Sequence, residues 1–83
     1  METIIHPLST EKSIRLMESD NVLVFVVKKS SIKSEIKKDI EENFKVKVDG
    51  IRTTIMPDGR KKAYVRINRA NPAIDVATQL GMI

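Results

Sequence analysis

The fold of this chain is decided by residues 61–67, whose sequence is Lys-Lys-Ala-Tyr-Val-Arg-Ile. Every second residue from Ala63 onward is apolar, and the residues between them are Lys62, Tyr64 and Arg66. Successive side chains of a β-strand point to opposite faces of the sheet. The stretch therefore predicts a strand with one face toward a core and a second face that is cationic with one aromatic ring.

Positive charge is concentrated around this strand. The 83-residue chain has 15 Lys and Arg residues against 11 Asp and Glu residues. Residues 60–69 contain five of these bases and no acid: Arg60, Lys61, Lys62, Arg66 and Arg69. Without them, ten bases would face eleven acids, so the whole positive excess is local. A local excess is typical of a surface that binds a polyanion, and nucleic acid is the first candidate.

The composition argues against several other kinds of site. The absence of cysteine excludes disulfides, zinc–thiolate sites and a thiol nucleophile, and His6 is the only histidine. No Ser-His-Asp grouping and no glycine-rich phosphate loop is evident. We therefore expect no enzyme, no metal, no cofactor and no small-molecule substrate. No apolar run approaches the ~20 residues that span a bilayer, and no signal-peptide pattern is present, so we expect a cytoplasmic protein.

Six further elements are predicted around this strand. They are a short strand at 4–5, a helix at 9–18, a strand at 22–27, a helix at 32–44, a strand at 46–56 and a helix at 71–80. The strand Val22–Val27 is apolar at every position, which is typical of a strand covered on both faces. We expect one α+β domain over residues 1–83, a small antiparallel sheet with helices on both faces in the order β-α-β-α-β-β-α.

The turn Pro57-Asp58-Gly59 fixes the register of the last two strands. In a three-residue loop, proline takes the first turn position and glycine a positive φ, so that Met56 lies opposite Arg60. Arg52 then lies opposite Tyr64 and Thr54 opposite Lys62, which places all four on one polar surface. A two-residue loop would mismatch the faces, and Asp49-Gly50 permits a bulge in the earlier strand.

Capping residues predict where the first and last helices begin and end. A hydroxyl at Ser9 or Thr10 suits the start of the first helix. Asn71 suits the cap of the last helix, with Pro72 in its first turn. Gly81 suits the end of that helix, with Met82 and Ile83 folding back against the core.

Residues 61–68 also fit a family signature. It consists of two basic residues, Ala or Met, an aromatic or β-branched residue, an aliphatic residue, a basic residue or Thr, Leu, a polar residue and, after seven more, an apolar one. Ile67 replaces the usual leucine, and Val76 stands at the last position. Near the start, Thr10-Glu11-Lys12 matches the family's Ser/Thr-Glu-Lys opening. On these two motifs, nearly the whole chain resembles the L23 family of large-subunit ribosomal proteins.

The resemblance implies that the polar face binds large-subunit ribosomal RNA, chiefly its third domain, beside the polypeptide exit tunnel. Composition alone gives equal weight to a solvated sheet face. If the face binds RNA, its cations neutralise phosphates and Tyr64 stacks on a base or packs on a ribose. The candidate RNA-binding residues are Lys12, Arg15, Lys28, Lys29, Lys33, Arg52, Thr54, Arg60, Lys61, Lys62, Tyr64 and Arg66.

The resemblance also implies protein partners. Neighbouring large-subunit proteins are expected, and the surface of Ser9, Thr10 and Glu11 is expected to dock the signal recognition particle or a nascent-chain chaperone. In bacterial relatives the matching glutamate docks trigger factor. The alternative for these residues is a capped helix start with no partner.

Departures from the bacterial pattern indicate the branch of the family. Bacterial members carry a long basic loop that reaches into the tunnel, whereas here Pro57-Asp58-Gly59 alone joins the two strands. The basic N-terminal extension of eukaryotic members is also missing, so an archaeal form is expected, located in the ribosome in the cytoplasm.

The alternative binding module is an RNA-recognition domain outside the ribosome. Ala63, Tyr64 and Val65 fit the first ribonucleoprotein motif of such domains. Lys61 replaces its glycine, however, and Lys62 replaces an aromatic residue. Because these domains stack several bases on sheet aromatics, a chain with one Tyr and two Phe fits them poorly.

Overall fold

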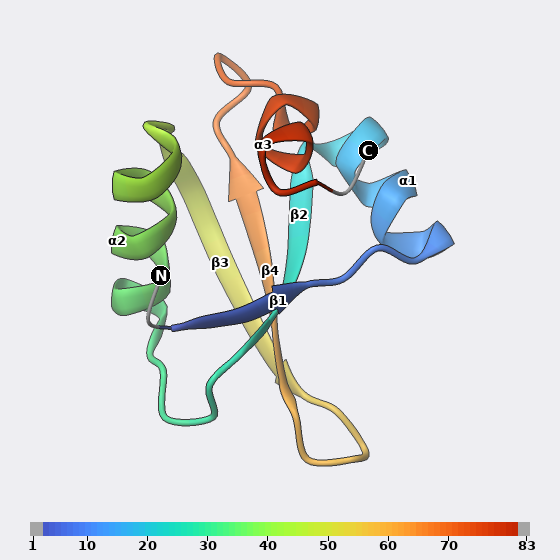
Figure 1. The fold of residues 1–83 in the computed structure, drawn as a ribbon, viewed down its shortest axis with the longest axis vertical. Coiled ribbons are helices and arrows are strands. Elements are labelled where there is room, and N and C mark those ends of the chain that lie inside the picture. The colour runs from blue at the N-terminus through green and yellow to red at the C-terminus, as the bar shows by residue number, and fades with distance from the viewer. Residues whose placement is uncertain (1–2, 82–83) are drawn as a thin grey trace.

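The computed structural model describes residues 3–81 and orders their elements as predicted. The strands are β1 (Ile4–Pro7), β2 (Val22–Val27), β3 (Val48–Ile55) and β4 (Lys61–Ile67), and the helices are α1 (Glu11–Asp20), α2 (Lys33–Phe44) and α3 (Ala73–Gln79). The strands form one antiparallel sheet in the order β1-β2-β4-β3, with the helices packed around it (Figure 1). The predicted α+β class and element order are confirmed. The expected positions of Met82 and Ile83 lie outside the described residues.

Strand β2 is the centre of the core, as its uniform apolar sequence predicts. All six of its residues are buried, and Phe25 has no exposed surface. One face of the strand packs with buried residues from all three helices, and α3 lies in front of the sheet in Figure 1. The members of this core are Met17, Leu23, Phe25, Val27, Ile36, Ile40, Val48, Ala63, Val65, Ile67, Ala73, Val76 and Ala77.

The opposite face of β2 presents Val22, Val24 and Val26, which are buried but lie outside that core. Their partners in β4 are polar, because Val24 pairs with Tyr64 and Val26 with Lys62. Polar side chains can contribute to the cover on this face, because their stems bury apolar parts while their charges stay in water. Helix cover is thus unequal between the two faces, since α2 and α3 contribute buried residues only to the first.

The hairpin of β3 and β4 has the predicted register. Arg52 pairs with Tyr64 and Thr54 with Lys62, and a register shift stands between Val48 and Gly50, where a bulge was expected. The Met56 N–H donates to the carbonyl of Arg60 at 2.7 Å, and Gly59 adopts a φ of 94°. The turn is therefore the three-residue loop inferred from Pro57-Asp58-Gly59.

Strand β3 begins later than predicted. Val46 and Lys47 lie outside it, because the first paired residue is Val48. Three other contacts hold this segment. The Val48 N–H donates to Glu41 Oε2 at 3.0 Å, the Lys47 N–H donates to Asn71 Oδ1 at 3.3 Å, and the Asn68 N–H donates to the carbonyl of Lys47 at 2.8 Å. Side chains from α2 and from the segment before α3 therefore add to the backbone just after β4 in holding these residues.

The start of α3 also differs from the prediction. Asn71 does not cap the helix; the side chain of Asn21, at the end of α1, does so instead. Asn21 Oδ1 accepts from the Ala73 N–H at 2.6 Å, while its Nδ2 donates to the carbonyls of Ile67 and Asn71 at 2.9 and 3.0 Å. One side chain therefore joins the ends of α1 and β4 to the start of α3.

Candidate nucleic-acid interface

The cationic face of the sheet consists of Arg52, Thr54, Lys62, Tyr64 and Arg66. Pairing between β3 and β4 brings these five together, although they are spread over 15 positions of the chain. The Arg52 Cζ and the Lys62 Nζ each lie 5.3 Å from the centre of the Tyr64 ring. Cations at this distance are attracted by the ring electrons, typically by about 0.5 to 1 kcal/mol at exposed sites. The face therefore holds two positive charges beside its aromatic ring.

This arrangement suits single-stranded or unpaired RNA. Lys and Arg neutralise phosphates, and a half-buried tyrosine provides a flat surface on which a base stacks. Buried valines of β2 lie on the same face, and they limit the movement of the residues that pair with them. Because the strands are rigid elements, the backbone positions that carry the cations and the ring are set before any ligand arrives.

A hollow of about 390 Å³ lies at one end of the cationic face. Tyr64, Arg52 and Arg66 line it together with two acids, Asp20 and Asp49. Neither acid is among the residues that the sequence predicts for the interface. Asp49 directly precedes Gly50, which pairs with Arg66. The predicted register therefore already placed Asp49 near Arg66. Asp20 reaches the hollow through the placement of α1, for which the sequence offered no signal.

Lys61 does not belong to the cationic face. It shares a face with Ala63 and Val65, and its Nζ donates to the carbonyl of Ser31, before α2. Arg60 and Lys29 lie with Lys61 at the turn end of the sheet, around a separate hollow that also includes Asp58. These three cations therefore form a second group, the turn group (Lys29, Arg60 and Lys61).

Asp58 forms an ion pair with Arg60, one of the three cations of the turn group. Its Oδ2 accepts from Arg60 Nε at 2.8 Å, and its Oδ1 accepts from the Arg60 backbone N–H at 3.1 Å. The backbone hydrogen bond from Arg60, followed by the guanidinium, holds the pKa of the Asp58 carboxyl below its usual value. Arg60 is thus partly neutralised at the turn, unlike Arg66.

The remaining RNA candidates lie apart from both groups. Lys12 lies in the first turn of α1, Lys28 follows β2, and Lys33 begins α2; all three side chains are exposed. None of them lines the hollow of the cationic face. The hollow beside Tyr64 is therefore formed without these three cations.

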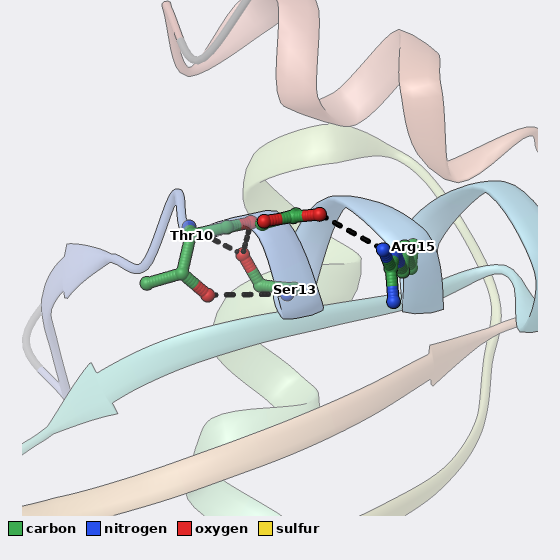
Figure 2. Close-up of polar contacts among 4 residues, drawn as sticks. Thr10, Ser13 and Arg15 are labelled. Atoms are coloured by element: carbon green, nitrogen blue, oxygen red, sulfur yellow. Dashed lines mark hydrogen bonds and ion pairs between the residues drawn. The ribbon is translucent and has the colours of Figure 1, made fainter.

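The start of α1 is a capped helix end with an exposed ion pair. The Ser13 N–H donates to Thr10 Oγ1 at 3.2 Å, and the Thr10 N–H donates to Ser13 Oγ at 2.8 Å (Figure 2). The Thr10 hydroxyl therefore has a structural role. Arg15 pairs with Glu11 at 2.8 Å, and the two side chains are 76% and 83% exposed. Arg15 thus shares a surface with Glu11 and is not part of the cationic face.

Within residues 3–81, no group of three or more His, Cys, Asp and Glu side chains is arranged to hold a metal ion. In the same part of the chain, no helix is long and apolar enough to cross a membrane.

Comparison with known proteins identifies similar chains. A family model described as "Ribosomal protein L23" matches residues 2–74. The large ribosomal subunit protein uL23 of Caldivirga maquilingensis is 49% identical over 74 residues, which cover 89% of this chain and 86% of that protein. The large ribosomal subunit protein uL23 of Trypanosoma brucei brucei is 40% identical over 80 residues, or 96% of this chain. The present chain spans only 49% of the length of the Trypanosoma protein.

Proposed function

Because the chain belongs to the ribosomal protein L23 family, whose members are structural proteins of the large ribosomal subunit and not enzymes, we propose that its cationic face binds large-subunit ribosomal RNA. The site on the RNA is its third domain, beside the polypeptide exit tunnel. Other partners are the neighbouring large-subunit proteins. The family agrees with the expected location in the ribosome of the cytoplasm, and it favours the ribosomal interpretation over an RNA-recognition module elsewhere. The similarity to the archaeal protein fits the expected archaeal form.

The observation that supports this proposal best is the placement of two cations beside Tyr64: Arg52 lies directly opposite it in β3, and Lys62 lies two residues before it in β4. Both cations lie 5.3 Å from the ring centre. A base that stacks on Tyr64 brings its phosphates close to these charges. Contact with each phosphate releases condensed counterions, which gives the complex its salt dependence. The ring adds stacking energy, which depends little on salt.

A salt titration with transcribed third-domain RNA tests the proposal. Replacing Lys62 and Arg66 by Ala should weaken binding and reduce the slope of log K against log salt by about 0.7 to 0.9 for each lost phosphate contact. The matched control is Lys37→Ala with Lys38→Ala, which removes two exposed charges from α2. An equal loss of slope in both variants would show that net charge, and not this face, determines the affinity.

We also propose that Glu11 belongs to a docking surface for the signal recognition particle or a nascent-chain chaperone. The carboxylate is 83% exposed at the start of α1, on a helix end fixed by Thr10 and Ser13. An exposed charge at the rim of an interface mainly affects the association rate. Ser9 is exposed beside it.

Purified ribosomes that carry Glu11→Ala test the docking surface. The variant should enter ribosomes normally and recruit the signal recognition particle or the chaperone more slowly, with weaker dependence on salt. Glu42→Ala, an exposed acid on α2, is the control for loss of charge. If ribosomes with Glu11→Ala recruit these factors at the normal rate, Glu11 is only a residue of the helix start and the docking proposal fails.

A further inference from the structure

The hollow at the end of the cationic face combines features that simple phosphate binding does not need. The residues that line it include Tyr64, Arg66 and Asp20, together with the apolar residues Leu16 and Val22. A volume of about 390 Å³ lies in the usual range for small-molecule pockets. A carboxylate in a site for phosphates alone would weaken binding through like-charge repulsion. Its presence therefore points to a ligand that donates hydrogen bonds.

Asp20 has no structural partner that explains its position. It is the last residue of α1, where the helix dipole disfavours a negative charge. Within residues 3–81 the ion pairs are Arg15–Glu11 and Arg60–Asp58, and the Asp20 carboxylate takes part in neither of them and in no side-chain hydrogen bond. By contrast, Asp49 Oδ1 accepts from Asn68 Nδ2 at 3.0 Å, which accounts for that second acid.

The guanidinium of Arg66 is also without an ion pair among the described residues. Arg66 is the second-last residue of β4, at the open end of the hairpin, and its register partners are Val22 and Gly50. Because glycine has no side chain, Gly50 leaves space beside Arg66 on the outer strand, and an added Cβ there would meet nothing within 4 Å. The hollow thus presents an unpaired acceptor and an unpaired donor beside an aromatic ring.

Guanine is the RNA base whose hydrogen-bonding groups match this set. Its Watson–Crick edge carries two adjacent donors, N1–H and N2–H, which a carboxylate accepts with its two oxygens. Its O6 and N7 are the acceptors that arginine contacts most often. Adenine presents the N1 acceptor to a carboxylate. Uracil offers one donor, N3–H, between two acceptors, and cytosine offers one amino group next to the N3 acceptor, so neither presents two adjacent donor groups. All four bases can stack on an aromatic ring, so stacking alone does not distinguish them.

We propose that this hollow holds one unpaired guanine of the ribosomal RNA. Asp20 accepts from N1–H and N2–H, Arg66 donates to O6 or N7, and the base stacks against Tyr64. The inference rests on the proposed RNA-binding function and adds to it a base preference at one position. Sequence-specific contacts to RNA usually involve unpaired bases of this kind, because the edges of bases in an A-form helix are poorly accessible.

Short RNA probes test the base preference with the full chain. The probes are uridine hexamers with one central guanosine, adenosine or inosine, and binding is measured by fluorescence anisotropy at constant salt. The guanosine probe should bind about 5- to 100-fold more tightly than the adenosine probe, the range for one bidentate contact to a base. Inosine lacks the N2 amino group and should lie between them. Equal affinities, or no binding by the guanosine probe, would overturn the proposal.

The variant Asp20→Asn tests whether the Asp20 carboxylate is the group that distinguishes guanine from adenine. It should reduce the preference for guanosine over adenosine to less than about twofold, because the amide accepts one hydrogen bond and opposes the second donor. Loss of a negative charge at a helix C-terminus should not destabilise the fold. Glu18→Gln is the matched control, since it removes the same charge from another side of α1 and lies outside the hollow. A preference that persists in Asp20→Asn would also overturn the proposal.

Failure of this inference differs from failure of the proposed function. If the third-domain RNA binds with the salt dependence expected above but the hexamers show no preference, the cationic face binds RNA and the hollow does not read a base. If the third-domain RNA does not bind, the proposed function itself fails.

Discussion

Strand β4 gives Ala63 and Val65 to one face of the sheet and Lys62 and Tyr64 to the other. The first face is packed against helices and has no exposed surface at these two residues. The second is half-buried at Lys62 and Tyr64, which pair with buried valines of β2. Stability should thus depend mainly on the first face and RNA affinity on the second. Substitutions on a single strand or its neighbours can test this separation.

Truncation on the core face should have the largest effect. Phe25→Ala removes a side chain with no exposed surface and should cost about 3 to 5 kcal/mol of the free energy of unfolding. Urea denaturation followed by circular dichroism measures this loss, and Phe25→Leu should cost much less. A loss below about 1 kcal/mol for the alanine variant would contradict the central position of β2.

Loss of Asn21 should have the next largest effect, because its side chain attaches α3 to the core face. Asn21→Ala removes the cap of Ala73 and leaves a non-glycine residue at a φ of 58°. We expect a loss of about 2 to 4 kcal/mol in the free energy of unfolding. Asn21→Gly relieves the backbone strain and should recover about 1 kcal/mol of it. If Asn71→Ala lowered the free energy of unfolding more than Asn21→Ala, Asn71 and not Asn21 would be the more important residue at the start of α3.

Removal of the aromatic ring should affect the second face alone. Tyr64→Ala should weaken binding to third-domain RNA by about 1 to 3 kcal/mol, with little change in the salt slope. Tyr64→Phe keeps the ring and should bind like the native protein. Isothermal titration calorimetry at two salt concentrations measures both quantities. The opposite result, a lower salt slope with little loss of affinity at constant salt, would mean that the ring mainly positions the cations.

The adjacent residues Lys61 and Lys62 provide a finer test, since they lie on opposite faces. Lys62→Ala should lower the salt slope of RNA binding by about 0.7 to 0.9, the value for one phosphate contact. Lys61→Ala should leave this slope unchanged, because its Nζ donates to the carbonyl of Ser31. Electrophoretic mobility shifts over a salt series are sufficient for this comparison. Equal changes in both variants would remove the distinction between the cationic face and the turn group.

The smallest effect should be the pH dependence of the turn that joins the two strands. The folded state lowers the pKa of the Asp58 carboxyl, chiefly through the Arg60 backbone N–H. Its contribution to stability is therefore present above the unfolded pKa and disappears as the pH falls through the lower folded value. Carboxyl carbon NMR should show Asp58 titrating below its usual value, and still below it in Arg60→Ala. Titration at the usual value in the native protein would contradict the turn geometry.

Much of the fold follows from patterns within a few residues. Alternation in residues 61–67 determined the two faces of β4, and the turn Pro57-Asp58-Gly59 determined which residues of β3 lie opposite them. The hydroxyl of Thr10 capped α1 as expected, because cap and helix are neighbours in the chain. The family followed from two short motifs. In each case the interacting groups are close in sequence or related by a fixed period.

Only the tertiary structure decided contacts that depend on where a helix is placed. The start of α3 is capped by Asn21, 52 positions away from Ala73, because packing brings the end of α1 beside it. The same packing puts Asp20 into the hollow on the cationic face. The approach of the segment before α2 also gives Lys61, which alternation already places on the core side of β4, the Ser31 carbonyl as a partner. Periodicity specifies which side of an element is apolar, but it does not specify how two elements pack in space.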